Sequence, residues 1–319
     1  MLTFLTTAPH SYTHNVVAAC DRFDFKLLSY NRAFRARSLP RGTYIFADAD
    51  RLGFWELELA SRLFRLLRGS GLRVFNDPAT LRQRYSMLRE LHYQGYNRFN
   101  VWQADDSTRP ARYPVFLRTQ SAHRGTLSEL LNDEAQIQTA ITEALVKGLP
   151  MRELILVEYC AEPLRPGLFR KLATFRVGDR MVSTTCVHES HWSAKYGELG
   201  IAPQDVYDDE YAIVNENRWG EPLRKAFEIA GAQYGRADFA LVQGVPAAYE
   251  INTNPMLDRI TSHPFPIRVK ADALFYQRYF DAVCEIDSDA SGKAVALDDE
   301  VLALQRKRDR FVLRGRWLP

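Results

Sequence analysis

The sequence predicts a chain of mixed α/β and α+β class, with a small parallel sheet first and antiparallel hairpins later. Two observations carry this prediction: a strand-helix-strand pattern in the first 80 residues, and paired strand-like runs joined by turn residues beyond residue 160. The length of 319 residues suggests two domains or one large one. With 46% hydrophobic residues the chain can bury a sizeable core, which excludes disorder, collagen and coiled coil.

The first 80 residues alternate strand-like and helical runs. Residues 2–7, 43–48 and 72–77 are rich in β-formers, and apolar side chains from Phe54 to Leu67 recur at helical spacing. A strand, a helix and a strand in this order form a βαβ unit, which implies a parallel sheet.

Beyond Asp77 the pattern changes to shorter strands with fewer helices. Pro78 suits the first turn of a helix that runs through Leu91. The next expected elements are a strand at 112–120, a turn-rich loop at 121–128, a polar helix at 129–147 ended by Gly148, and an apolar strand at 154–160.

Two hairpins are expected in the second half of the chain. One spans 169–186 and turns at Gly178-Asp179, and the other spans 237–255 and turns near Gln243-Gly244. Between and after them we expect a polar, aromatic loop up to about residue 215, helices at 221–234 and 267–284, and from 286 a linker with a basic amphipathic tail that docks or stays mobile.

Composition narrows the class of partner and the compartment. The 42 Lys and Arg nearly balance the 39 Asp and Glu and are scattered among them, which argues against a nucleic-acid partner. Four cysteines without a CxxC pair indicate neither a disulfide framework nor a zinc ribbon. No secretory signal and no membrane-spanning run is evident, so we expect a cytoplasmic protein with no membrane partner.

Three oxygen-bearing side chains are expected to converge on the second hairpin. Asp238 begins one strand, and Glu250 and Asn252 end the next, two residues apart and therefore on one face. Carboxylate and amide oxygens suit Mg²⁺, or Mn²⁺, and largely apolar neighbours argue against plain solvated charges. The sequence therefore predicts a metal site on this hairpin.

A second metal motif is weaker. Cys186, His188 and His191 have a spacing that invites a zinc site, but a fourth ligand is missing. We therefore expect polar substrate or structural contacts from these residues rather than zinc.

The segment GRADFALVQGVPAAYEINTNP (235–255) resembles the C-terminal signature of the ATP-grasp superfamily. The order of segments from about residue 2 to 260 is similar to that in D-alanine:D-alanine ligase and related carboxylate-amine ligases. This resemblance implies an ATP-grasp fold: an N-terminal βαβ pre-ATP-grasp domain followed by two α+β subdomains that clasp the nucleotide. The implied boundaries are 1–80, 81–285 divided at 160, and 286–319 for the linker and tail.

The resemblance also assigns the nucleotide contacts. Arg118 stands on a strand where the family more often has Lys, and Ser121, Arg124 and Gly125 belong to a phosphate-covering loop that holds one glycine. Residues LVEYC match the hinge strand that meets adenine. The implied contacts there are Glu158, Tyr159 and Cys160 for the base, Glu162 for the ribose and Lys171 for phosphate.

Catalytic and substrate residues follow from the same match. Lys195, in an AKY triplet, would neutralise the moving phosphoryl group, and Arg236 would steady an oxyanion. A buried ion pair with Asp238 or Glu250 is the competing role for Arg236. Asn254, Arg259 and His10, which follows the first strand, are the expected substrate contacts.

The implied reaction joins a small-molecule carboxylate to an amine through an acylphosphate, with ATP and Mg²⁺ as cofactors. Two alternatives stay open: a kinase that phosphorylates a hydroxyl at the same ATP site, and a non-catalytic nucleotide-binding scaffold. A homodimer is also an open alternative, since dimers are common among similar ligases.

Overall fold

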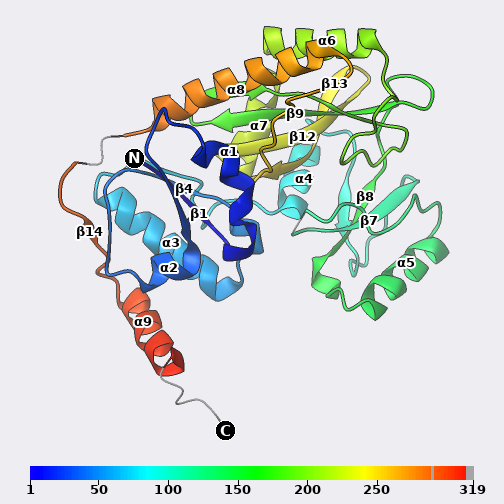
Figure 1. The fold of residues 1–319 in the computed structure, drawn as a ribbon. Helices are drawn as coiled ribbons and strands as arrows, with labels where there is room; N and C mark the ends of the chain where they lie inside the picture. The colour runs from blue at the N-terminus through cyan, green and yellow to red at the C-terminus, as the bar shows by residue number, and fades with distance from the viewer. Residues whose placement is uncertain (122, 289–290, 314–319) are drawn as a thin grey trace.

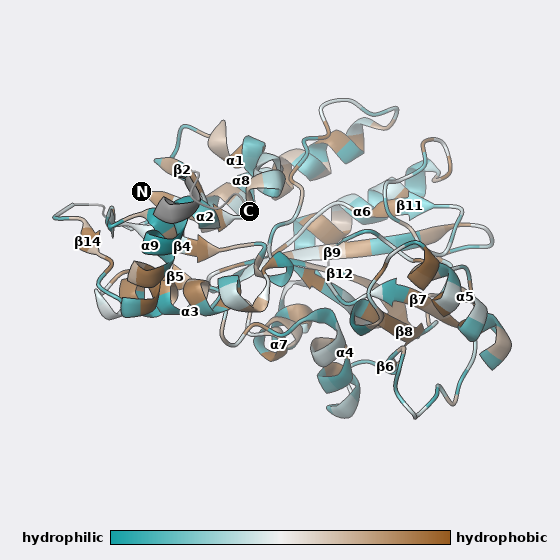
Figure 2. Cartoon of the chain, turned by 90° about the horizontal axis from the view of Figure 1, so that it is seen from below, coloured by the Kyte–Doolittle hydropathy of each residue, from teal (hydrophilic) through white to brown (hydrophobic). Residues whose placement is uncertain are grey.

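The structure is a computed structural model that describes residues 1–121, 123–288 and 291–313. It contains a parallel sheet at the N-terminus, a large antiparallel sheet and a three-stranded antiparallel sheet (Figure 1). In Figure 2, β9 and β12 run between the N-terminal elements at one end and β7, β8 and α5 at the other. No helix in the described part of the chain is long and apolar enough to cross a bilayer.

The N-terminal sheet is parallel, which confirms the βαβ prediction. Its central strands are buried along their whole length, as in parallel sheets covered on both faces. The sequence did not indicate β2 or α2, and the strand expected at 72–77 shortens to two residues. In spatial order the strands are β2 (Phe25–Ser29), β1 (Leu2–Thr6), β4 (Thr43–Phe46) and β5 (Val74–Phe75). The helices of this part are η1 (Ala8–His14), α1 (Asn15–Ala18), α2 (Tyr30–Arg35), η2 (Ala49–Arg51) and α3 (Phe54–Gly69).

The described part of the C-terminal tail docks on this N-terminal unit. Strand β14 (Val295–Ala296) pairs with β3 (Ser38–Leu39), and α9 (Glu300–Leu313) packs on α2 and α3. Leu302 is fully buried in this contact. Residues 314–319 of the tail lie outside the described residues, and the domain boundaries stay a prediction.

The small, three-stranded sheet contains the two strands expected at 112–120 and 154–160, which span residues 115–119 and 154–158 in the structure. The helix expected at 129–147 begins only at Glu134, because the Asp133 carboxylate caps it by accepting the N–H of Gln136. The order of strands is β6 (Val101–Gln103), β8 (Leu154–Glu158) and β7 (Val115–Thr119), with α5 (Glu134–Val146) and η3 (Met151–Glu153) attached.

The large sheet contains both predicted hairpins, with turns at Gly178-Asp179 and Gln243-Gly244. Helices α4 and α7 pack on one face, while α8 packs on the other and carries α6. Strands in order are β10 (Arg180–Ser183), β9 (Phe169–Val177), β12 (Tyr234–Val242) and β13 (Val245–Asn252), and β11 (Val187–Glu189) also pairs with β9. The helices are α4 (Arg84–Tyr93), α6 (Gln204–Glu216), α7 (Gly220–Ala230) and α8 (Pro266–Ile286).

Two element predictions were wrong. Pro78 does not enter a helix, because Asp77 accepts the N–H of Ala79 and holds a turn, and α4 begins only at Arg84. The loop expected up to residue 215 is largely helix α6. Acidic residues are interspersed with the apolar stripe, which includes Val206 and Ile213, and one of them, Glu210, is itself buried, so the helical period is weak in the sequence.

Candidate active site

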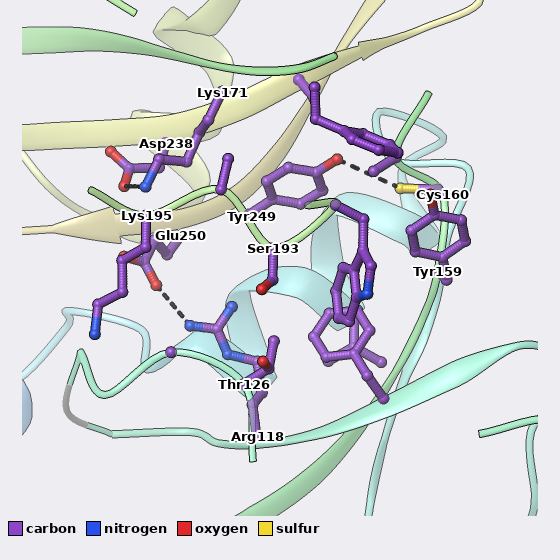
Figure 3. Close-up of a pocket in the computed structure, with 18 of the residues that line it drawn as sticks. Arg118, Thr126, Tyr159, Cys160, Lys171, Ser193, Lys195, Asp238, Tyr249 and Glu250 are labelled. Carbon is purple, nitrogen blue, oxygen red and sulfur yellow. Dashed lines mark hydrogen bonds and ion pairs between the residues drawn. The ribbon is translucent and has the colours of Figure 1, made fainter. Parts of the chain in front are cut away.

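A pocket lies between the small sheet and the large sheet (Figure 3). One wall comes from β7, the loop after it, and β8, and the other from β9, β12 and β13, while residues 192–195 add a further side. The predicted residues that line it are Arg118, Gly125, Glu158, Tyr159, Cys160, Glu162, Lys171, Lys195, Asp238 and Glu250.

The hairpin of β12 and β13 presents the expected oxygen donors on one face. Asp238 pairs directly with Glu250, and Arg236 pairs with Asn252, so all four side chains project to the same side. The predicted hairpin geometry is therefore confirmed. A β-bulge follows, since Phe239 already pairs with the residue two before Glu250.

The Glu250 carboxylate is surrounded by basic side chains. Arg84 and Arg118 donate to the same oxygen at 2.6 and 2.8 Å, and Nδ1 of His123 lies 3.3 Å from the other oxygen. Burial favours a higher pKa, but the positive charges of Arg84, His123 and Arg118 outweigh it and hold the pKa of Glu250 well below its usual range. The group is a carboxylate at neutral pH.

His123 joins the loop after β7 to the N-terminal unit. Its Nε2 lies 3.5 Å from Asp50, in η2, and its Nδ1 faces Glu250. Burial favours a lower pKa, yet the two carboxylates outweigh it and raise the pKa of His123 to about 9. The ring is therefore a cation at neutral pH.

Asp238 is paired in the same way. Nε of Arg236 lies 2.7 Å from one oxygen and Nζ of Lys171 lies 3.4 Å from the other, as Figure 3 shows for Lys171. The ion pair that competes with an oxyanion role for Arg236 is thus formed in this structure. Together five basic groups face three carboxylates, a surplus of positive charge that suits a polyphosphate.

The donor set fits a hard divalent cation. Asp238 and Glu250 are directly paired across the hairpin, and Oδ1 of Asn252 already accepts the N–H of Asn254 at 2.8 Å. All three are oxygen donors on one buried face, the chemistry that Mg²⁺ and Mn²⁺ prefer.

The other end of the pocket is aromatic. Trp192 lies with its ring centroid 5.0 Å from that of Phe116 and meets Tyr159 edge-on at 5.5 Å. Burial raises the pKa of Cys160 to about 12, so it is a neutral thiol beside the Tyr249 hydroxyl. Such a wall fits a planar, largely apolar ring system.

Hydrogen bonds to both the backbone and the side chain hold the segment that carries Lys195. One carboxylate oxygen of Glu189 accepts the N–H groups of Lys195, Tyr196 and Gly197, and these hydrogen bonds lower the pKa of Glu189 against the effect of burial. Nζ of Lys195 donates to the carbonyl of Arg124 at 3.1 Å. This contact links the segment to the loop after β7.

Comparison with solved structures identifies the architecture. The sequence matches no protein-family model and no curated protein. Two crystal structures of D-alanine–D-alanine ligase from Bacillus anthracis, one of them complexed with ATP, align with TM-scores of 0.51 and 0.53 at 11% identity, covering 97% of this chain and 99% of theirs. The VanG D-Ala:D-Ser ligase from Enterococcus faecalis aligns with a TM-score of 0.51 at 11% identity, covering 89% and 98%.

The chain has the ATP-grasp fold. The predicted fold class is therefore confirmed, with the parallel sheet followed by the two parts that enclose the pocket.

The predicted residues Ser121, Arg124, Arg236 and Asn252 lie outside the pocket lining. Ser121 donates to Glu153 beneath the loop, and Arg124 takes part through its carbonyl. Glu158 lines the pocket, but its carboxylate accepts the N–H of Asn100 and pairs with Arg112.

The three expected substrate residues do not form one group. Asn254 donates to the carbonyl of His10 at 3.2 Å and accepts from Thr13 at 2.9 Å, so its amide ties the end of β13 to η1. Arg259 lies apart, on Asp272 and 4.4 Å from the ring centroid of Tyr276. His10 itself contacts Thr7 and Asp48.

Four residues in or next to the pocket were missed in the sequence. Asp50 follows strand β4 within the run ADAD, and acids at the carboxyl end of a parallel strand are a usable signal. Trp192 lies two residues before the AKY triplet, and an aromatic there was a weaker signal. Arg84 and His123 had none, since one sits among many surface arginines and the other in a loop.

Proposed function

We propose that this chain is an ATP-dependent ligase that joins a small-molecule carboxylate to an amine, with release of ADP and phosphate. The observation that carries the proposal is the face shared by Arg236, Asp238, Glu250 and Asn252 at the cationic end of an aromatic-walled pocket. The ATP-grasp fold supports the same reading.

ATP fits this pocket with its base at the aromatic end. Trp192 and Phe116 supply ring faces for stacking, and the chain beyond β8, from Tyr159 to Glu162, borders the base and ribose. The triphosphate then reaches Arg118 and Lys171, which exchange their carboxylate partners for phosphate oxygens.

Asp238, Glu250 and Asn252 would hold Mg²⁺, which neutralises the charge of the β- and γ-phosphates when bound. Because Glu250 stays ionised, it is available as a ligand across the neutral pH range. The basic groups released from these carboxylates remain next to the phosphates.

The chemistry then needs positioning more than side-chain nucleophiles. An oxygen of the substrate carboxylate attacks the γ-phosphorus, the bond to the ADP oxygen breaks, and an acylphosphate forms. The amine nitrogen attacks the acyl carbon, the carbon–oxygen bond to phosphate breaks, and the amine proton passes to solvent. Arg236, once it turns from Asp238, stabilises the oxyanion, and Lys195 offsets charge on the phosphoryl group.

A non-catalytic nucleotide-binding scaffold is the second candidate. Its support is that Glu250 is fully engaged by Arg84, Arg118 and His123, and that Asp238 is engaged by Arg236 and Lys171. If these pairs persist when nucleotide is bound, no carboxylate is left to hold a metal ion.

Calorimetric titration with a non-hydrolysable ATP analogue, with and without Mg²⁺, tests the nucleotide site. The proposal expects Mg²⁺-dependent binding in the wild type and its loss in the Asp238→Asn, Glu250→Gln double variant. Glu129→Gln is the matched control, because that acid is 80% exposed outside the pocket lining. No binding to the wild type contradicts the proposal, and binding indifferent to Mg²⁺ favours the scaffold.

A product assay separates the ligase from a kinase at the same site. Pairs of small acids and amines are screened for ADP release, and each positive is checked for free phosphate. A ligase releases phosphate in step with ADP, whereas a kinase keeps the phosphoryl group on its product. ADP release with a phosphorylated alcohol and no free phosphate contradicts the ligase.

A further inference from the structure

A buried cluster outside the nucleotide pocket gathers three metal-ligating side chains. Cys186 and His188 lie two residues apart where β11 begins, so they project to one side, and Glu210 reaches them from α6. One ligand atom from each lies within 4.8 Å of the other two. All three residues are at most 1% exposed, and none lines the nucleotide pocket.

The polar atoms of this cluster are incompletely satisfied. Neither ring nitrogen of His188 has a hydrogen-bond partner within the described ranges of the chain, and Oε1 of Glu210 makes no hydrogen bond there either. Leaving such a buried group unpaired costs about 1–3 kcal/mol. Among the residues that the structure describes, the ring of His188 is thus buried without a hydrogen bond and Oε1 of Glu210 has only the ion pair with Arg268 at 3.5 Å, which indicates a missing ligand between these side chains.

Neighbouring groups hold the three side chains in place. The second oxygen of Glu210 accepts the N–H of Cys186 at 2.7 Å, and the His188 ring meets Tyr207 edge-on at 5.5 Å. Contacts of this kind orient the ligands around a bound ion.

The cluster corrects the zinc motif considered in the sequence. His191 is not part of it, because its ring contacts Ser193 and Glu129 at the surface. Glu210, 22 residues beyond His188 in the printed sequence and on another element, takes the third position instead.

We propose that Cys186, His188 and Glu210 bind a zinc-class divalent cation, separate from any ion at the nucleotide site. Thiolate, imidazole and carboxylate together favour Zn²⁺ over Mg²⁺, which prefers oxygen ligands alone. Three protein ligands leave one position of a tetrahedral site for water or a further group. On binding, the Cys186 thiol releases its proton, so two anionic ligands balance the charge of the ion.

Nearby arginines are already engaged. Arg268 donates to the carbonyl of Cys186 at 2.9 Å and lies 3.5 Å from Glu210, and Arg170 donates to Asp209 at 2.5 Å. Arg268 also lies over the ring of Tyr207, with 5.1 Å to its centroid. The guanidinium of Arg268 therefore lies next to the cluster, whereas the charge of Arg170 is paired with Asp209.

A cation bound to this cluster would also stabilise the segment that carries Lys195 at the nucleotide pocket. The residue after His188 is Glu189, whose carboxylate holds the N–H groups of residues 195–197. A metal ion on His188 therefore fixes the strand that anchors the segment carrying Lys195.

Metal analysis of the full chain tests the proposal. Protein purified without chelator is exposed to Zn²⁺, desalted and measured by mass spectrometry for total metal. We expect one equivalent per chain in the wild type, in His191→Gln and in Glu250→Gln, and its loss in His188→Gln and Cys186→Ala. Glu250→Gln separates this site from the nucleotide site, so the proposed function can fail while this inference stands.

Cobalt substitution gives a second, spectroscopic readout of the site in the wild type. A Co²⁺-loaded wild type should show a thiolate-to-cobalt band in the near ultraviolet, and His191→Gln should keep it. A wild type that retains no metal, a cobalt spectrum without the thiolate band, or full retention in His188→Gln would each overturn the inference.

Discussion

Arg84 and Glu250 form a buried ion pair, and breaking it should cost far more stability than breaking a surface pair. Their side chains are 4% and 13% exposed, and the N–O distance is 2.6 Å. Removing one member of a buried pair costs about 3–5 kcal/mol when its partner is left alone. Here Glu250 keeps Arg118 and His123, but the carbonyl groups of Thr119 and Gln120 also lose the guanidinium that donates to them. We expect Arg84→Met to lower the free energy of unfolding by this amount.

Arg82→Met is the matched control, two residues earlier in the chain. Arg82 is 43% exposed and lies 3.6 Å from Glu90, a pair that contributes at most about 1 kcal/mol. Both variants are unfolded in urea without nucleotide and followed by circular dichroism.

A double-mutant cycle isolates the interaction. Arg84→Met combined with Glu250→Gln should cost about 1–3 kcal/mol less than the sum of the single changes, because removing both charges leaves less charge uncompensated. The reasoning fails if Arg84→Met behaves like Arg82→Met, or if the two changes simply add.

Three further predictions concern the pocket and its hairpin. Trp192→Ala should weaken ATP binding by about 1–3 kcal/mol in a calorimetric titration, through loss of base stacking, and leave inorganic triphosphate binding unchanged; an equal loss for both ligands contradicts the stacking role. The raised pKa of His123 means that its stabilisation is fully present below about pH 6.5 and lost as pH rises through about 9, a slope that unfolding curves should lack in His123→Gln. Gly235→Ala should destabilise the fold by about 1–3 kcal/mol, since the added Cβ would lie 2.7 Å from the carbonyl oxygen of Asn252 at a φ of +153°. Gly244→Ala, which meets no atom within 4 Å, should cost about 1 kcal/mol in the same urea assay, and equal losses at the two glycines would contradict the close-contact argument.

Local pattern predicted the elements that position the site. Alternation along β12 and β13, with turn residues at Gln243-Gly244, was enough to place Asp238 opposite Glu250. It failed where polar residues masked a helical period, as in α6, and where a side-chain turn displaced a helix start, as at Asp77.

Local sequence pattern could not predict which basic groups surround Glu250. Arg84 lies 166 residues from Glu250 in the chain and His123 lies 127 residues from it. Nothing in the spacing of either residue records that contact, because it arises from the packing of separate elements around the pocket.

The cluster of Cys186, His188 and Glu210 could likewise be predicted from the sequence only in part. Cys186 and His188 were visible in the sequence as near neighbours, but the spacing offered only His191 as a third ligand, and no zinc site was expected there. Only the packing of α6 against β11 brings Glu210 to them, and it leaves His191 at the surface. The sequence by itself determined the two hairpins and the face on which the acids lie, since these depend on periodicities of a few residues. Which charges meet those acids was decided by the tertiary structure, because contacts between distant segments form only when the elements pack.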